Sequence, residues 1–226
     1  QFVKETSEKY SLSEFFLLPF RQRKALREAD LYHSPHYTLP FFLGIPAVVT
    51  IHDVIHLTRP ESRIQRFFAY RMIKSAVKRA AHLISVSEES VRRLTETVGT
   101  VKTPMTVTSN ALQEGFEVLP RSEVSDYLRQ NGYRMGEYCL FVGNERPHKG
   151  FTELLHAWAD LLLHSWGGIN VPELIAVGER YSSISYDLVQ DLGLKQKVRF
   201  VGRVPRELLT HLYNGAQAVI VPSKEE

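Results

Sequence analysis

The sequence predicts an α/β fold made of two Rossmann-like parallel sheets. Short apolar strands alternate with amphipathic helices along almost the whole chain, and this alternation is typical of parallel, doubly wound sheets. The pattern stops once, between Ser109 and Phe116, where no periodicity is visible, and a second strand–helix series begins at Tyr138. We therefore expect two units, residues 1–115 and residues 116–226, rather than one continuous sheet.

The first unit is expected to contain four strands and three helices. The strands are short apolar runs: Leu31–Ser34, Ala47–His52, Leu83–Val86 and Met105–Thr108. The helices carry apolar residues at helical spacing near residues 13–28, 62–81 and 88–98. Ser87 precedes Glu88 and Glu89, so we expect a helix N-cap here, with the two carboxylates favouring the helix start.

The second unit repeats the pattern. Strands are expected at Tyr138–Val142, Glu173–Val177, Val198–Val201 and Ala218–Val221. Helices are expected near residues 122–130, 150–163, 184–191 and 205–214. Ser122 before Glu123 resembles the Ser87 arrangement, which predicts a second serine cap.

The composition is that of an ordinary soluble globular protein. Of 226 residues, 43% are hydrophobic and 23% are charged, enough apolar side chains for a sizeable core. No apolar run has the length of a membrane span, and the first ten residues do not resemble a signal peptide. The single cysteine, Cys139, lies in an expected strand, so we expect a buried, reduced thiol. A chain without a disulfide framework fits a cytoplasmic location.

The charge is uneven along the chain. Residues 1–110 carry 16 Lys and Arg against 10 Asp and Glu, a net of +6, whereas residues 111–226 carry 12 against 15, a net of −3. On the helix expected near 62–81, five cations are expected on one side: Arg63, Arg66, Arg71, Lys74 and Lys78. Apolar residues are expected on another: Ile64, Phe68, Met72, Ala76 and Ala80. This face is either simply solvated or attracted to an anionic membrane surface. Aromatic residues do not alternate with these cations, so nucleic acid is not an expected partner.

Histidines cluster after two strands of the first unit. They occur in His33-Ser34-Pro35-His36 and in the run from Thr50 to His56. Ligands of α/β sheets gather at the carboxyl ends of strands. His52 therefore either faces a cleft and binds a substrate hydroxyl, or is satisfied by nearby backbone, or joins Asp53 and His56 in a metal site. Ser34 and Asn110 also lie at or after strand ends, and the sequence assigns neither of them a binding role or a structural role.

The run from Phe141 to Gly150 has the character of a phosphate-binding turn. It joins an apolar strand to a helix, and it contains Gly143, Asn144, Arg146, Lys149 and Gly150. Free backbone N–H groups at a helix start attract an anion, and Lys149 adds a full positive charge. The spelling matches neither a Walker loop nor a dinucleotide GxGxxG motif.

Together, these segments resemble the family 4 retaining glycosyltransferases. The motifs "HSPHYTLP", "VVTIHDVIHLTRPE", "AAHLISVSEES", "PMTVTSNAL", "FVGNERPHKG", "VRFVG" and "AVIVPSKEE" occur in the family's order. The resemblance implies a GT-B fold with an acceptor-binding domain first and a nucleotide-sugar domain second. It also implies transfer with retention of configuration and without a metal. By the same resemblance, His52 lines the cleft near the donor sugar, Lys149 neutralises the donor diphosphate, and Glu226 faces the donor hexose.

The chain departs from the family pattern in two places. Many members have an Arg where this chain has Asn144, and Arg146 is the candidate replacement. The family's second glutamate, eight positions after the first, lies beyond Glu226, and the opening strand and glycine-rich turn are missing before Gln1. We therefore expect a fragment that lacks both ends, with both domains incomplete and without activity on its own.

The expected function is that of a retaining glycosyltransferase. It would move a hexose from a GDP- or UDP-sugar, with a mannose-type donor favoured, to a glycan or lipid-linked acceptor. The nucleotide-sugar is a substrate, and no cofactor is expected. The location would be cytoplasmic, at or near the inner face of the membrane. Two alternatives stay open: a metal-dependent hydrolase that uses His52, Asp53 and His56, and a non-catalytic nucleotide-sugar-binding module.

Overall fold

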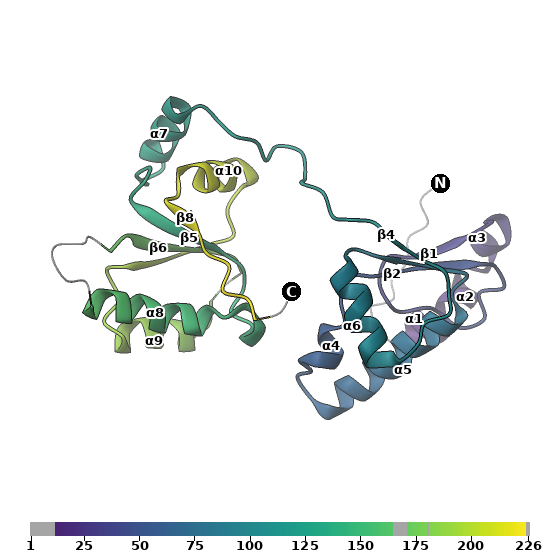
Figure 1. Ribbon diagram of the computed structural model, residues 1–226. Coiled ribbons are helices and arrows are strands. Elements are labelled where there is room, and N and C mark those ends of the chain that lie inside the picture. Colours follow the sequence, from purple (N-terminus) through teal and green to yellow (C-terminus); the bar gives the residue numbers. More distant parts are fainter. Residues whose placement is uncertain (1–11, 165–170, 180, 225–226) are drawn as a thin grey trace. The chain divides into compact units, whose positions relative to one another are not determined.

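A computed structural model describes residues 12–164, 171–179 and 181–224. The chain divides into two compact units, one up to Ala111 and one from Leu112 (Figure 1). This division lies within a few residues of the junction expected from the sequence. Each unit contains a parallel sheet, and the α/β class expected from the sequence is confirmed.

The described part of the first unit forms a four-stranded parallel sheet in the order β1-β2-β3-β4. The strands are β1 (Tyr32–Ser34), β2 (Ala47–Ile51), β3 (His82–Ser85) and β4 (Met105–Val107). The helices are α1 (Leu12–Phe16), α2 (Leu18–Arg21), α3 (Arg23–Glu28), α4 (Ile55–Thr58), α5 (Arg63–Arg79) and α6 (Glu88–Val98). All four expected strands are present, with ends that differ from the expected ends by at most one residue.

The first core lies on one face of this sheet. Alternate residues of β2, Ala47, Val49 and Ile51, pack with Ile73 of α5 and Leu94 of α6, as the period of two along a strand requires. The other face carries polar pairs between neighbouring strands. There His33 hydrogen-bonds Thr50 and His82 hydrogen-bonds Thr106, each at 2.9 Å.

The helix expected near residues 13–28 is wrong as one element, because the structure divides it into α1, α2 and α3. Pro19 lies in the first turn of α2. Proline has no N–H and its ring clashes with the preceding turn, so it starts helices and interrupts them.

Serine caps explain two helix starts but not a third. The Ser62 hydroxyl accepts the Gln65 N–H at the start of α5, and Ser87 accepts the Ser90 N–H at the start of α6, both at 3.1 Å. The cap expected from Ser122 is wrong. Helix α7 (Arg121–Gln130) begins one residue earlier, after Pro120, whose φ of −57° already suits a helix start.

The second unit is a three-layer sandwich. Its sheet has the order β7-β6-β5-β8, from β5 (Tyr138–Val142), β6 (Glu173–Val177), β7 (Val198–Gly202) and β8 (Ala218–Val219). Helices α8 (Phe151–Leu163) and α9 (Ser183–Asp191) cover one face, and α7 and α10 (Arg206–Gly215) cover the other (Figure 1).

Alternation along β5 builds the two cores of this sandwich. Cys139 and Phe141 pack toward α8 and α9, whereas Tyr138 and Leu140 pack toward α7 and α10. The expected buried thiol of Cys139 is confirmed, and burial raises its pKa. In the described parts of the chain, no helix is long and apolar enough to cross a membrane.

Candidate functional site

The candidate site lies at the carboxyl edge of the second sheet, where the strand order reverses. β5 pairs with β6 on one side and with β8 on the other. Ligands of open α/β sheets bind outside the strand ends at such a reversal. The segment 143–150 follows β5 here; we call it the donor loop, after the donor diphosphate that the sequence resemblance leads us to expect there.

Three glycines at this edge let the backbones approach closely. Gly143 donates its N–H to the Val177 carbonyl at 2.9 Å, and Gly178 donates to the Gly202 carbonyl at 3.0 Å. A Cβ atom on Gly178 would lie 1.8 Å from the Gly143 carbonyl oxygen, so no other residue fits there. Sequence reasoning found Gly143 but missed Gly178 and Gly202. The sequence did contain a signal for Gly178 and Gly202, because each follows directly after an expected strand.

Glu145 ties the donor loop to α9. Its carboxylate accepts the Ser182 N–H at 3.0 and 3.1 Å and the Ser185 hydroxyl at 2.5 Å. Burial alone would raise the pKa of Glu145, but these hydrogen bonds outweigh it and lower the pKa. Sequence reasoning missed this contact because its partners lie almost forty residues further along the chain.

Tyr181 also anchors the donor loop, at its first residue, Gly143. Its hydroxyl donates to the Gly143 carbonyl at 3.2 Å. Burial raises the pKa of Tyr181, so the hydroxyl keeps its proton at neutral pH. The ring packs between Phe151 and Phe200, with centroids 5.0 and 4.6 Å away, and therefore connects the loop to the core.

The far end of the donor loop turns sharply into α8. Pro147–Lys149 form one 3₁₀ turn, and Gly150 has a left-handed φ of 67° at the N-cap of α8. A Cβ on Gly150 would lie 2.2 Å from the Pro222 carbonyl oxygen, so this close approach also requires glycine. No side chain caps the first N–H groups of α8, which leaves that helix end suited to an anion.

The segment after β8 runs beside the donor loop. The Lys224 N–H donates to the His148 carbonyl at 2.8 Å, and the Lys224 ammonium pairs with Glu153 in the first turn of α8. The loop is therefore supported from both neighbouring strands. Glu226, expected to face the donor hexose, lies outside the described residues.

The five expected binding residues all lie in the donor loop: Gly143, Asn144, Arg146, Lys149 and Gly150. The Asn144 side-chain oxygen accepts the Arg146 N–H at 3.2 Å, so Asn144 shapes the turn that carries Arg146. The Arg146 side chain is exposed, and Lys149 is half-buried. Among the described residues, the Arg146 guanidinium has no hydrogen-bond or ion-pair partner.

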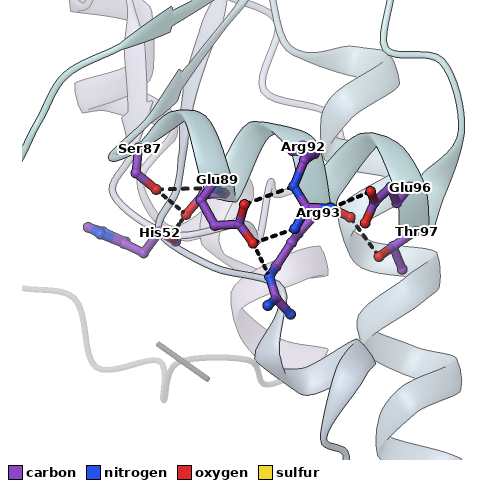
Figure 2. A network of polar contacts seen from close by, with 8 residues as sticks. His52, Ser87, Glu89, Arg92, Arg93, Glu96 and Thr97 are labelled. Atoms are coloured by element: carbon purple, nitrogen blue, oxygen red, sulfur yellow. Dashed lines mark hydrogen bonds and ion pairs between the residues drawn. The ribbon is translucent and has the colours of Figure 1, made fainter. Parts of the chain in front are cut away.

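In the first unit, His52 follows directly after β2. Its side chain is exposed, and ring atom Nε2 lies 3.0 Å from the Pro35 carbonyl. A carbonyl can only accept, so Nε2 carries the proton and Nδ1 of the neutral ring is an acceptor. The His52 backbone carbonyl accepts the Ser90 hydroxyl at 2.9 Å, which anchors this position to α6. The ring itself extends away from that helix (Figure 2).

The side chains of the alternative metal site have different partners. An Asp53 oxygen accepts the Ile55 N–H at 2.9 Å and starts α4, and the His56 ring packs edge-on against Tyr37 at 5.9 Å. His52 precedes α4 and so does not share a helical face with His56. Over the described ranges of the chain, no three His, Cys, Asp or Glu side chains are placed to hold a metal ion.

Ser34 and His36 form a buried structural network. The Ser34 hydroxyl lies 2.9 Å from His36 Nδ1, and His36 Nε2 lies 3.0 Å from a Glu14 carboxylate oxygen. This order resembles a hydrolase triad. Ser34, however, is 0% exposed, and its hydroxyl also lies within 2.6 Å of the Thr38 carbonyl. The network therefore fixes the segment after β1 and offers no accessible nucleophile.

The charged groups of α6 form a second network, which is separate from the His52 ring (Figure 2). Glu89 accepts hydrogen bonds from Arg92 and Arg93, and Arg92 also bonds Glu96. Hydrogen bonds from the two arginines lower the pKa of Glu89 to about 2. These groups lie on the exposed side of one helix, so they support the helix itself.

Each of the two units matches a known protein family. The family "Glycosyltransferase Family 4" matches residues 4–113, and "Glycosyl transferases group 1" matches residues 128–226. The chain is 29% identical over 223 residues to the O-antigen chain mannosyltransferase RfbU of Salmonella typhimurium, covering 96% of this chain and 54% of that protein. It therefore spans about half the length of the curated relatives that it matches.

Solved structures share the fold. Sucrose-phosphate synthase from Thermosynechococcus elongatus superposes with a TM-score of 0.72 at 20% identity, over 92% of this chain and 53% of that one. Anabaena Alr3699/HepE in complex with UDP-glucose gives 0.68 at 19% identity, over 87% and 55%. The two family matches cover one unit each: the first unit matches the family 4 glycosyltransferases and the second unit matches the group 1 glycosyl transferases.

Proposed function

We propose that the protein carrying this chain is a retaining glycosyltransferase that uses a nucleoside diphosphate sugar. The second unit binds the donor, and the first unit binds a glycan or lipid-linked acceptor. The observation that carries the proposal is the donor loop, because Arg146 and Lys149 directly precede α8 at the strand-order reversal and no side chain caps that helix.

The chemistry of the leaving group supports this assignment. Cleavage of the sugar–phosphate bond builds negative charge on the departing diphosphate, and preorganised cations and backbone N–H groups stabilise that charge. Lys149 and the first N–H groups of α8 supply this stabilisation, and Arg146 adds a second cation. In this proposal, the contacts of Glu145 and Tyr181 hold the loop in shape before the donor arrives.

A mannose-type donor is favoured, with a GDP-sugar first and a UDP-sugar second. The relative from Salmonella typhimurium is named a mannosyltransferase. A structure of the same fold contains UDP-glucose, so the base is the point that an assay must decide.

In this proposal His52 contacts the donor sugar or the acceptor hydroxyl. Its Nε2–H bond to Pro35 fixes the ring orientation and leaves Nδ1 as the acceptor. Glu226 keeps its expected role facing the donor hexose. The protein would act in the cytoplasm without a cofactor, and its glycosyl product would keep the donor's anomeric configuration.

Calorimetry tests the donor site. Lys149→Ala should weaken binding of GDP or UDP by about ten- to hundredfold, since a charge-assisted hydrogen bond contributes about 1.5–3 kcal/mol. The matched control is Lys195→Ala, an exposed lysine that precedes β7 at the opposite edge of the sheet. An equal effect of both substitutions, or no effect of Lys149→Ala, would rule out the diphosphate role.

A turnover assay separates the enzyme from a non-catalytic binding module. The whole protein should release nucleoside diphosphate from GDP-mannose or UDP-glucose only when a glycan acceptor is present. Nuclear magnetic resonance of the product should show the donor's anomeric configuration. Tight nucleotide binding without turnover would favour the binding module, and an inverted product would contradict the retaining mechanism.

A further inference from the structure

The first unit contains an apolar pocket that has no role in the proposed donor site, which lies in the second unit. Its volume is about 600 Å³, and it lies among α1, the segment between β1 and β2, His56 of α4, and α5. Phe68, Ala69 and Met72 line it from α5; spacings of three and four residues put them on one side of that helix. Phe16 and Phe41 line it from the other two segments.

The walls of this pocket are held by the protein's own contacts. The Phe41 N–H donates to the Phe15 carbonyl at 2.9 Å, and the Phe41 ring stacks on Phe16 with centroids 5.2 Å apart. The Arg79 guanidinium lies 4.6 Å from the Phe41 ring and donates to the Leu39 carbonyl at 3.1 Å. The pocket is therefore formed before any ligand arrives, which reduces the entropy cost of binding.

The polar side chains at this pocket are engaged elsewhere. The Thr38 hydroxyl donates to Glu14 at 3.1 Å, and the Gln65 side-chain oxygen accepts the Glu61 N–H at 2.6 Å. Two further lining residues carry polar groups, Tyr37 and His56, and their rings pack against each other with centroids 5.9 Å apart. The other lining residues are phenylalanine, alanine and methionine side chains. Such a lining suits a hydrocarbon, because a polar ligand would lose hydrogen bonds to water without replacement.

The surface beside the pocket mixes apolar and basic residues. On α5, Ile64, Phe67 and Phe68 are 70%, 61% and 54% exposed. Of the apolar residues expected on the side of α5 away from the cations, Ile64 and Phe68 are therefore exposed. The buried residues of α5 are Ala69, Ile73, Ala76 and Val77. Exposed cations lie on the same helix: Arg63, Arg66, Arg71 and Lys74. Apolar groups flanked by cations match the boundary between the acyl chains and anionic headgroups of a membrane.

We propose that this pocket holds a hydrocarbon chain of a membrane lipid with a phosphate-bearing, anionic headgroup. In this arrangement the cations of α5 face the headgroups, and the chain enters beside Phe68. The proposal deepens the acceptor side of the proposed function, because a lipid-linked acceptor has this chemistry. Lipid binding itself does not require sugar transfer.

The test uses the whole protein and vesicles of phosphatidylcholine, with or without phosphatidylglycerol, that contain a phospholipid with a photoreactive acyl chain. After illumination, mass spectrometry should find labelled peptides from α1 and α5, with more label on the anionic vesicles. Phe68→Asp should lower this labelling about tenfold, as expected when a buried aromatic contact is lost. Its matched control is Phe67→Asp, which places the same charge one residue away on the same helix but outside the pocket lining. The control should change labelling about twofold or less.

Phe16→Ser, on a different wall, provides a second variant if Phe68→Asp does not fold. An equal loss for Phe67→Asp and Phe68→Asp would show a flat contact surface and overturn the pocket. Absence of label from α1 and α5, including the case where another part of the whole protein covers them, would also overturn it. The labelling test contains no donor sugar and measures lipid binding alone. A separate assay that found no transferase activity would contradict the proposed function but would not affect the labelling result.

Discussion

At the residue scale, Gly178 is the most constrained position of the candidate site. A methyl group there would overlap the Gly143 carbonyl, which belongs to backbone and cannot rotate away. Gly178→Ala should therefore destabilise the second unit by about 1–3 kcal/mol, the usual range for overpacking. Gly143→Ala is the control, because the atoms nearest to its added Cβ would belong to the Phe141 side chain, the first at 3.0 Å, and not to backbone. Urea unfolding measures both. Equal stability of Gly178→Ala and the wild type would show that the two strand ends are not held this closely.

Also at the residue scale, the Glu145 carboxylate makes the stability of the second unit depend on pH. Its pKa is lowered from the ordinary value of 4.5, so its contribution to stability is complete above about pH 4.5 and is lost as the pH falls below that value. Glu145→Gln should lower the melting temperature by about 2–4 °C at neutral pH, with a smaller difference from the wild type in acid. Melting curves from pH 3 to pH 7 test this. A difference that grows as the pH falls would contradict the carboxylate cap.

At the element scale, local pattern predicted most of what the structure contains. Short apolar runs located every described strand, and the glycines and cations after β5 located the donor loop. Local pattern failed where a distant partner or a single proline decides. Pro19, in the first turn of α2, accounts for the first of the two breaks in the helix expected near 13–28. Ile73 of α5 packs in the core with β2, although the sequence did not place it on the apolar side of that helix.

The same limit applies to the site. Lys149 and Gly150 could be found from the sequence because a strand-to-helix turn has a local signature. Glu145 and Tyr181 could not, since their importance depends on contacts between segments almost forty residues apart. His52 was placed at a strand end, but its Pro35 partner depends on how β1 and β2 align in the sheet.

At the scale of the whole molecule, the segment before α7 belongs to the second unit. The Thr210 hydroxyl donates to the Gly115 carbonyl at 3.0 Å, and the Leu119 N–H donates to the Asn214 side-chain oxygen at 3.0 Å. The Asn214 amide also donates to the Glu117 carbonyl at 2.9 Å. These contacts attach residues 115–119 to α10, although the residues have no regular structure.

These contacts predict where the second unit can be separated. Residues 112–226 alone should fold and bind GDP or UDP about as tightly as residues 1–226, because the donor loop and its supports all lie within them. Residues 120–226 should be less stable by about 1–3 kcal/mol, since they lose several hydrogen bonds to α10. Urea unfolding and calorimetry of the three chains measure both effects. The first unit would contribute to the donor site if residues 112–226 folded but bound nucleotide much more weakly than residues 1–226. Equal stability of the two shorter chains would instead show that the segment rests on α10 without stabilising it.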